Sequence, residues 1–342
     1  MVAIYSAVHF IVDFACAFIM FRSVSLSSDW YLCILIYNFC AFAMQMPLGI
    51  IADKLDKNYL LAGAGCLLVA GAYGLVGLPL AATVVVGLGN GIYHIGAGVD
   101  VLNISEKKSG ALGIFVSPGA FGVYFGTILG KASSFPAFTI VVALIAAAGV
   151  IIAAYRVWGG AYVKNAEFSP QIPSGGLIAV ACLVVVVCLR SYVGFALNFT
   201  WKGIGFWGLA LVFATVFGKT AGGFMSDRFG PVKSASFTLG IAALLFLFPL
   251  IPIAGVSSVL LFNMTMPVTL WAVARIIPGG KGFSFGLLTF ALFLGFLPAY
   301  LGAAAPPSWV VSILSVLSIA LLFTGLRKAR VSSKTIYYQL SS

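Results

Sequence analysis

Charged residues are scarce in this chain of 342 amino acids. Aspartate, glutamate, lysine and arginine make up 8% of it, whereas apolar residues make up 62% and the mean hydropathy is +1.12. A soluble domain carries roughly 25% charged and about 45–50% apolar residues. The scarcity of charge therefore excludes a water-soluble enzyme. The same composition excludes a disordered, collagen-like or nucleic-acid-binding chain, despite the net charge of +11.

Histidine is rare, and cysteine lacks any motif. The two histidines do not have the HExxH spacing, and no two of the six cysteines form a CxxC pair. Neither a zinc site nor a disulfide framework is therefore indicated. The sequence also lacks a nucleophile constellation and a soluble domain. We expect no metal, no cofactor and no enzyme activity.

Long apolar stretches fill the chain instead, and a bilayer-spanning helix needs about 20 such residues. The first stretch lacks a basic region and a cleavage site, so we expect it to be a membrane span and not a signal peptide. A polar segment at 158–175 separates six stretches from six more. The expected spans are 1–22, 30–52, 59–77, 79–103, 110–130, 135–157, 176–200, 203–226, 234–252, 255–276, 283–303 and 307–326.

The two halves of the sequence repeat each other. Gly49 and Asp53 recur 174 residues later as Gly223 and Asp227, at the ends of the second and eighth stretches. At an offset of 173, the matching pairs are Asn90 and Asn263, Lys108 and Lys281, Gly113 and Gly286, and Gly122 and Gly295. We predict an all-α membrane protein with six-helix bundles at 1–157 and 176–342, joined by a cytoplasmic linker at 158–175. Such repeats are typical of secondary transporters, whose site lies at the midplane between the bundles.

The loop charges predict an orientation. With both termini inside, fourteen basic residues lie on the inner loops and tail, against Arg22, Lys131 and Lys202 on the outer loops. This bias predicts a multi-pass protein of the bacterial cytoplasmic membrane with both termini cytoplasmic, and it explains the positive charge without a nucleic-acid partner. The inner basic residues are Lys54, Lys57, Lys107, Lys108, Arg156, Lys164, Arg228, Lys233, Arg275, Lys281, Arg327, Lys328, Arg330 and Lys334.

The repeated loops share an order of glycine, aspartate and base, namely Gly49, Asp53 and Lys54 in the first and Gly223, Asp227 and Arg228 in the second. This order resembles the loop signature of the major facilitator superfamily. Glycine allows two helices to approach closely, and an aspartate can meet the positive N-terminus of a neighbouring helix and a basic side chain. We predict that these loops latch the bundles in one state and release them in the other. Asp56 stands where a second glycine is usual, so we expect a weaker first latch.

The chain more closely resembles the fosmidomycin-resistance-type efflux branch of that superfamily. The matching pieces are His9-Phe10-x-x-Asp13, Gly87-x-Gly89-Asn90-Gly-Ile-Tyr-His94-x-Gly96, Ser117-Pro-Gly119-Ala-Phe-Gly122 and Leu189-Arg190-Ser191-Tyr192. The resemblance implies a major facilitator fold, efflux and antibiotic resistance. Ile95 and Thr127 stand where prolines are usual, so the drug substrate is not carried over.

Two ionisable residues fall near mid-depth in the bilayer. Arg190 lies fourteen residues into its span, or about 21 Å, and Asp13 lies twelve residues from Met1, or about 18 Å. A charge at that depth costs roughly 2.5–3.5 kcal/mol and is by default a functional candidate. We expect Arg190 to bind an anionic group through its fork of donors; a structural ion pair with Asp13 is the alternative. His9 and Asp13, four residues apart, could bind a proton together, or Asp13 could be anchored to backbone beside a bystander histidine.

Further polar residues are candidates for the substrate site. Asn90 and His94 share a helix face, where a helix–helix hydrogen bond is as good an explanation as a substrate contact. Asp100 is expected to pair with bases near the inner surface. Lys219 is expected to be structural and to extend to the inner surface. Tyr124, Tyr192 and Asn263 complete the predicted substrate-binding residues.

Together these features predict a proton-coupled exporter, an antiporter of a small anionic or zwitterionic compound, working by alternating access. The glycines and Pro118 of the stretch 110–130 resemble a motif of exchangers and favour antiport. An importer of a small anionic nutrient is the alternative, and a non-transporting receptor or scaffold is a distant one. The expected partners are the substrate, protons and the lipid bilayer, and we expect a monomer.

Overall fold

The computed structural model describes residues 1–158, 163–168, 175–277 and 279–340, with side chains through residue 328. Within these residues the regular structure is helical throughout. Of the predicted linker 158–175, residues 159–162 and 169–174 lie outside the described residues. The side chains of Arg330 and Lys334, which the sequence places on the inner tail, lie outside them as well.

The first half of the chain forms eight helices in six spans. They are α1 (Val2–Arg22), α2 (Trp30–Asn38), α3 (Gln45–Leu55), α4 (Asn58–Ala72), α5 (Pro79–Ile104), α6 (Gly110–Val116), α7 (Gly119–Ala132) and α8 (Ala137–Trp158). A π-helical segment, Phe39–Ala43, joins α2 to α3 in one span. The short segments Val24–Leu26 and Tyr73–Leu75 are 3₁₀ helices.

The second half forms the remaining spans from seven helices. They are α9 (Gly176–Ala196), α10 (Trp207–Phe229), α11 (Pro231–Phe246), α12 (Pro252–Asn263), α13 (Met266–Ile276), α14 (Lys281–Tyr300) and α15 (Ser308–Leu340). In the described part of the chain, eleven segments are long and apolar enough to cross a membrane, and α11 is a shorter apolar helix. Every predicted stretch thus corresponds to a helix or to two helices in line. The eighth span starts later than predicted, at Trp207, because turns occupy residues 200–206.

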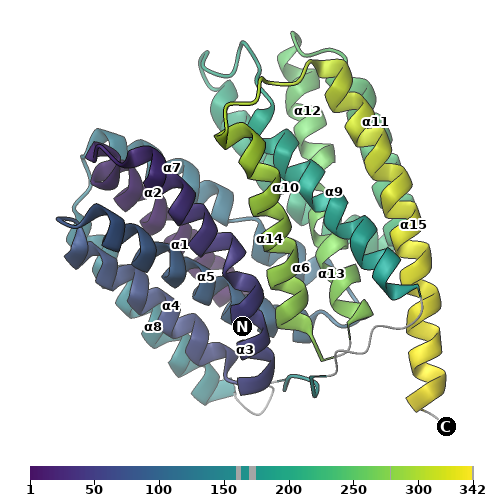
Figure 1. The fold of residues 1–342 in the computed structure, drawn as a ribbon, viewed down its shortest axis with the longest axis horizontal. Coiled ribbons are helices and arrows are strands. Elements are labelled where there is room, and N and C mark those ends of the chain that lie inside the picture. Colours follow the sequence, from purple (N-terminus) through teal and green to yellow (C-terminus); the bar gives the residue numbers. More distant parts are fainter. Residues whose placement is uncertain (159–162, 169–174, 278, 341–342) are drawn as a thin grey trace.

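The helices form two groups that stand side by side, purple to teal for the first half and teal to yellow for the second (Figure 1). In the first group α1 packs on α7, and α4 packs on α5 and α8; in the second, α9 packs on α14 and α15. The groups meet along two seams, where α3 contacts α14 and α6 contacts α10. Both termini point toward the same end of the molecule.

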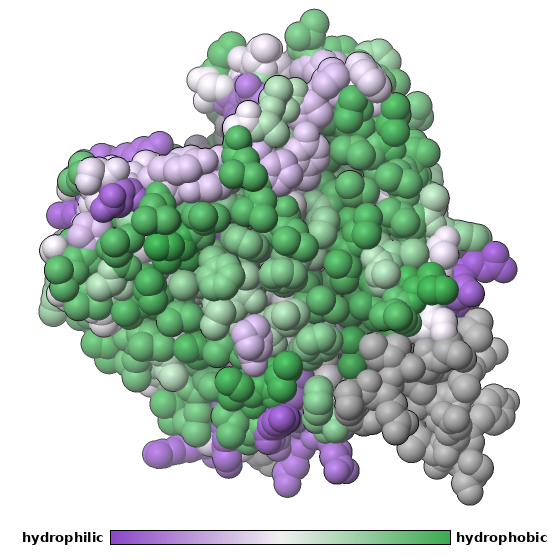
Figure 2. Space-filling view, in the orientation of Figure 1, coloured by the Kyte–Doolittle hydropathy of each residue, from purple (hydrophilic) through white to green (hydrophobic). Residues whose placement is uncertain are grey.

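Apolar side chains cover the middle of the surface, while polar residues gather at the two ends (Figure 2). This band suits the hydrocarbon core of a bilayer, which is about 30 Å thick. At the upper edge of the view the surface is notched between the two lobes.

Glycines bring the two seams into close contact. A Cβ atom at Gly113 of α6 would overlap the backbone carbonyls of Lys219 and Thr220 on α10, and one at Gly286 of α14 would overlap that of Gln45 on α3. Gly113 and Gly286 are repeat partners in the sequence. The repeat therefore places the same backbone-on-backbone contact at both seams.

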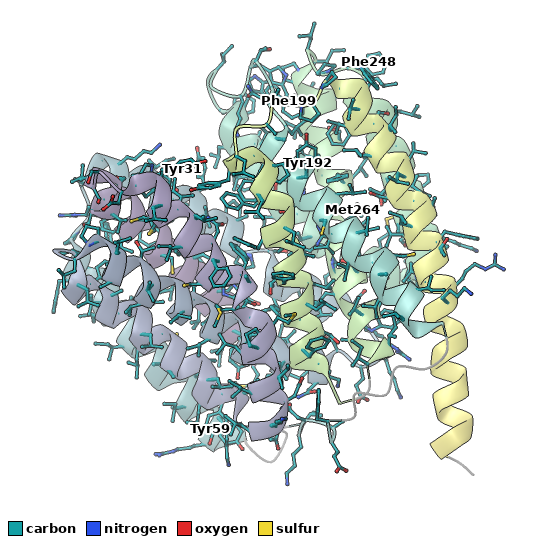
Figure 3. The ribbon with its side chains drawn as sticks, in the orientation of Figure 1. Tyr31, Tyr59, Tyr192, Phe199, Phe248 and Met264 are labelled. Carbon is teal, nitrogen blue, oxygen red and sulfur yellow. The ribbon has the colours of Figure 1, made fainter. Side chains whose placement is uncertain are left out.

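At the end opposite the termini, an aromatic pair spans one seam. The ring of Tyr31, on α2, stacks on that of Tyr300, on α14, at 4.2 Å between centroids. Each hydroxyl donates to the backbone oxygen of the other residue, at 2.6 and 3.0 Å. Tyr31 marks this contact where the two groups of helices meet in Figure 3.

Candidate functional site

The fifth span is broken at its middle, and the break supplies two backbone acceptors. Residue Pro118 has no N–H to donate, and the Ala120 N–H donates to Ser117 O rather than to the carbonyl one turn earlier. The carbonyls before the break instead face side chains. That of Phe115 lies 2.7 Å from His9 Nδ1, and that of Val116 accepts from Lys219 Nζ at 3.2 Å. One broken helix therefore holds ionisable side chains from both bundles.

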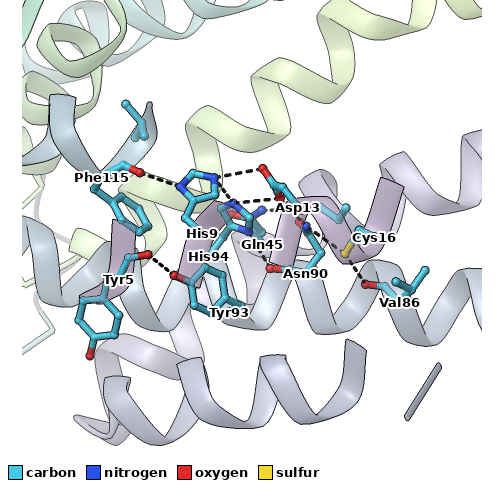
Figure 4. Close-up of polar contacts among 12 residues, drawn as sticks. Tyr5, His9, Asp13, Cys16, Gln45, Val86, Asn90, Tyr93, His94 and Phe115 are labelled. Carbon is cyan, nitrogen blue, oxygen red and sulfur yellow. Dashed lines mark hydrogen bonds and ion pairs between the residues drawn. The ribbon is translucent and has the colours of Figure 1, made fainter. Parts of the chain in front are cut away.

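Three ionisable side chains of the N-terminal bundle meet beside this break (Figure 4). His9 Nε2 lies 2.9 Å from His94 Nε2 and 3.2 Å from an Asp13 carboxylate oxygen. His94 Nε2 lies 3.7 Å from the other Asp13 oxygen. All three side chains are at most 14% exposed. We refer to these three residues as the triad.

Hydrogen-bond chemistry fixes the protons of the triad. His9 Nδ1 faces the Phe115 carbonyl, and His94 Nδ1 faces the Asn90 carbonyl at 2.9 Å. A carbonyl only accepts, so both Nδ1 atoms carry hydrogen. The two Nε2 atoms, 2.9 Å apart, would then present lone pairs to each other unless a proton lies between them. The geometry thus suits one imidazolium, one imidazole and one carboxylate, with no net charge.

Asn90 and Gly119 shape the surroundings of Asp13. The amide of Asn90 donates to an Asp13 oxygen at 2.9 Å and lies 3.5 Å from Cys16 Sγ. A Cβ atom at Gly119, the first residue of α7, would overlap both His9 Nε2 and an Asp13 oxygen. Asn90 and His94 are predicted substrate ligands. In the structure they contact Asp13 and His9, the proton-binding candidates of the same bundle.

The triad is also the arrangement most suited to a metal in the described residues. One ligand atom from each of His9, Asp13 and His94 lies within 4.8 Å of the others, and two imidazoles with a carboxylate suit several divalent metals. In a tetrahedral zinc site with bonds of 2.0–2.1 Å, two nitrogens lie about 3.3 Å apart. The observed 2.9 Å fits a shared proton without movement, so we interpret the triad as a proton site.

Arg190 lies in the C-terminal bundle beside a small cavity. Its guanidinium donates to Thr269 Oγ1 at 3.3 Å. Among the described side chains, no carboxylate forms an ion pair with it, so the alternative Arg190–Asp13 pair is not formed. Besides Arg190, Thr269 and Thr289, the cavity is lined by apolar residues, which are Val116, Val187, Met266, Leu270, Phe285, Leu288 and Leu292.

Lys219 differs from its prediction. It was expected to extend to the inner surface, but its ammonium points inward and donates to Val116 O. It lies within electrostatic range of Arg190 and of Asp13. Next to it, Thr220 Oγ1 lies 2.7 Å from Ser117 Oγ, across the seam between the bundles. The reason is the break in the fifth span, which leaves a carbonyl acceptor free in the interior.

Among the described residues, none of the other predicted substrate residues forms a hydrogen bond with the triad or with Arg190. Asn263 donates to the carbonyl of Val259, one turn earlier on its own helix. Tyr192, labelled in Figure 3, lies on the C-terminal bundle. Tyr124 packs edge-on against its neighbour Phe125.

Asp100 also differs from its prediction as an interfacial partner of lysines. The residue is 5% exposed and accepts from Tyr5 at 2.6 Å and from Asn58 at 2.8 Å. Asn58 also donates to Asn165, at 2.8 Å, in the described part of the linker. The carboxylate therefore lies inside the N-terminal bundle, where it accepts from a tyrosine and an asparagine.

The two loop aspartates meet helix N-termini across the seams. Asp53 accepts from the N–H groups of Gly282 and Phe283, at 2.7 and 2.9 Å, in the first turn of α14. Asp227 accepts from those of Ser109 and Gly110, at 2.6 and 2.9 Å, at the start of α6. These N–H groups have no partner within their own helix, and the helix dipole favours a negative charge there.

The basic residues of the two loops are placed differently. Lys54 lies over the Phe168 ring at 6.0 Å, and Arg228 lies over the Phe229 ring at 5.4 Å. Asp56 has φ of 47° and its repeat partner Gly230 has φ of 89°, so both loops turn through the left-handed region. Aspartate tolerates that region better than most residues, which explains how Asp56 replaces the usual glycine.

No protein-family model and no curated protein sequence matches the chain. Solved structures do. They include the fucose:proton symporter FucP of E. coli, with 14% identity, 95% of this chain and 98% of that chain covered, and a TM-score of 0.63. FucP in the outward conformation has 14% identity, 96% of this chain and 98% of that chain covered, and a TM-score of 0.66. The human organic anion transporter MFSD10 has 15% identity, 94% of this chain and 98% of that chain covered, and a TM-score of 0.65.

The chain has the major facilitator fold. This confirms the predicted fold class, with its twelve spans in two six-helix groups. The resemblance to the fosmidomycin-resistance branch stays a prediction. His9, Asp13 and Arg190 are candidates from the sequence alone. The inward position of Lys219, beside the break in the fifth span, is not predicted by the sequence analysis. The signal it could have used is Pro118, since a broken helix leaves carbonyls that attract cationic donors.

Proposed function

We propose that this chain is a secondary transporter, and not an enzyme, that moves a small anion together with a proton by alternating access. The observation that carries the proposal is the guanidinium of Arg190, which forms no ion pair with any described side chain and lies beside a cavity near the seam between the two bundles. On the other side of that seam, the triad has room for one exchangeable proton. Such midplane sites are typical of transporters built from repeats.

The substrate is proposed to be anionic because, among the described residues, Arg190 has a neutral hydroxyl as its single hydrogen-bond partner. An uncompensated charge in a low-dielectric interior is costly, so an anion that occupies the cavity gains from the guanidinium. Two of the similar structures are named a fucose:proton symporter and an organic anion transporter. These names support proton coupling and an anionic substrate.

The arrangement of charges favours cotransport over the exchange predicted from the sequence. Exchange requires proton and substrate to compete for one site. Here the proton belongs to the triad and the anion to Arg190, so the two occupy separate groups. A proton bound at the triad makes the centre more positive and attracts the anion, and by linkage the anion strengthens proton binding equally. The glycines of the fifth span pack closely on α10 and on α1, which includes Asp13.

We propose export as the direction, on the sequence resemblance, with uptake of an anionic nutrient as the second candidate. The membrane is the bacterial cytoplasmic membrane, with both termini inside and a monomer as the working unit. The Asp53 and Asp227 contacts, together with Gly49, Lys54, Gly223 and Arg228, are the proposed latch that holds the inner end closed. Breaking these contacts opens that end.

The experiment uses purified protein in lipid vesicles, with the membrane potential held at zero by potassium and valinomycin. Radiolabelled sulfate, phosphate and succinate are the probes. An acidic outside should drive accumulation of at least one probe, because the proton and anion enter together. Asp13→Asn should abolish this accumulation but keep exchange of labelled for unlabelled anion. Arg190→Ala should abolish both.

The sign of the gradient separates the alternatives. Accumulation driven by an acidic inside would establish exchange and overturn cotransport. Absence of flux for every probe would overturn the transporter proposal in favour of a receptor or scaffold. Unchanged anion affinity in Arg190→Ala would remove Arg190 from the substrate site. Asp29→Asn, an exposed outer-loop aspartate, is the matched control and should behave as wild type.

A further inference from the structure

Two cations of the C-terminal bundle lie at the centre without a counter-ion. Arg190 on α9 donates to a threonine hydroxyl, and Lys219 on α10 donates to the Val116 carbonyl. Within the described residues neither takes part in an ion pair. The charge of Arg190 repels that of Lys219, and the Asp13 carboxylate attracts it. Each forms one hydrogen bond to a neutral acceptor, and among the described residues no ion pair compensates either charge.

Val116 connects the two cations to one space. Its carbonyl binds Lys219 Nζ, and the same residue lines the cavity beside Arg190. Ser117, which follows it, contacts Thr220, which follows Lys219. The broken fifth span therefore contacts Lys219 and forms one edge of the cavity beside Arg190.

The triad does not balance these two charges once it holds its proton. The Asp13 carboxylate is then matched by one imidazolium, formed from His9 or His94, and contributes no net charge. The centre is left with the guanidinium and the ammonium. A bound ligand therefore needs two negative charges to neutralise it.

We propose that the cavity beside Arg190 binds a small oxyanion with two negative charges, with Lys219 as its second cationic ligand. The proposal rests on the proposed function, and it adds both the charge of the substrate and a residue to the site. Arg190 presents a planar fork to two oxygens, and Lys219 supplies a point charge to a third. Lys219 is not among the residues that line the cavity, so its ammonium must leave the Val116 carbonyl and turn toward the anion to bind it.

The test compares two probes of similar shape in equilibrium binding to the purified protein. Sulfate and methanesulfonate share a trigonal set of sulfonyl oxygens but differ by one charge, and neither titrates near neutral pH. Wild type should bind sulfate more tightly by at least about tenfold, the ratio that one charge-assisted contact supplies. Lys219→Met should bind both probes equally, while Lys219→Arg should keep the preference. Lys233→Met, the same substitution at an exposed lysine, is the control.

Lys219→Gln is a second neutral variant, because its amide can still donate to the Val116 carbonyl if Lys219→Met fails to fold. A preference for sulfate that survives in either neutral variant would overturn the role of Lys219. Failure of wild type to bind sulfate would overturn the dianion. Neither result would touch the proposed function, which fails if Arg190→Ala keeps its affinity, if no anion is transported, or if an acidic inside drives the accumulation.

Discussion

Gly119 decides how closely α7 approaches the triad. A methyl group at this position would overlap His9 Nε2 and an Asp13 oxygen. We predict that Gly119→Ala separates the two groups and reduces pH-driven anion flux by at least about tenfold, since even a 1.4 kcal/mol loss of proton-binding free energy changes an equilibrium tenfold. The measurement is anion accumulation in vesicles under an acidic outside.

A matched substitution separates this effect from helix propensity. Gly149, on α8, has no atom within 4 Å of an added Cβ, and alanine favours a helix over glycine. Gly149→Ala should therefore keep wild-type flux and lose no thermal stability. If Gly119→Ala also transported normally, the triad would have enough room to move and its tight packing would have no part in coupling.

At the scale of helices, Asp53 joins one bundle to the N-terminus of α14. Asp53→Asn keeps one acceptor but turns a donor toward the N–H groups of Gly282 and Phe283. Hydrogen bonds to a charged group contribute about 1.5–3 kcal/mol, so the inner end should open about tenfold more often. Spin labels at 57, just before α4, and at 233, in the first turn of α11, lie on exposed residues and should report a larger share of long distances.

Asp227 provides the equivalent test at the other seam, where it accepts from Ser109 and Gly110. Asp227→Asn should shift the same distance distribution in the same direction if both proposed latches hold the same end closed. Asp29→Asn, at the opposite end, should leave the distribution as in wild type. An unchanged distribution in both latch variants would show that the glycine seams alone hold the inner end closed.

The same elements show what a sequence can predict. Hydropathy locates the spans, because each must hide its backbone from lipid, and the repeat at 174 residues locates both aspartate loops. The triad is different. His94 joins His9 through helix packing over 85 positions, and no spacing rule reports such a contact. Lys219 was predicted to reach the surface. This prediction is wrong because the carbonyl that accepts from its ammonium is free only where Pro118 breaks a neighbouring helix.

For the whole molecule, the proposed cargo predicts how transport responds to voltage. One proton and one dianion carried together move one net negative charge per cycle. A membrane potential contributes about 2.3 kcal/mol per charge for each 100 mV. An inside-negative potential therefore drives this cargo outward, which reconciles cotransport with the export that the sequence resemblance implies.

We predict that vesicles loaded with labelled sulfate, without a pH gradient, release it faster when a potassium gradient and valinomycin make the interior negative. An interior-positive potential should slow the release. Lys219→Met loaded with methanesulfonate should respond to neither potential, because one proton and one monoanion carry no net charge. This variant keeps Arg190 and the triad, so it isolates the charge of the cargo from the ability to transport. Faster release from wild type with a positive interior would mean that net positive charge leaves with the anion, which one proton per dianion cannot supply.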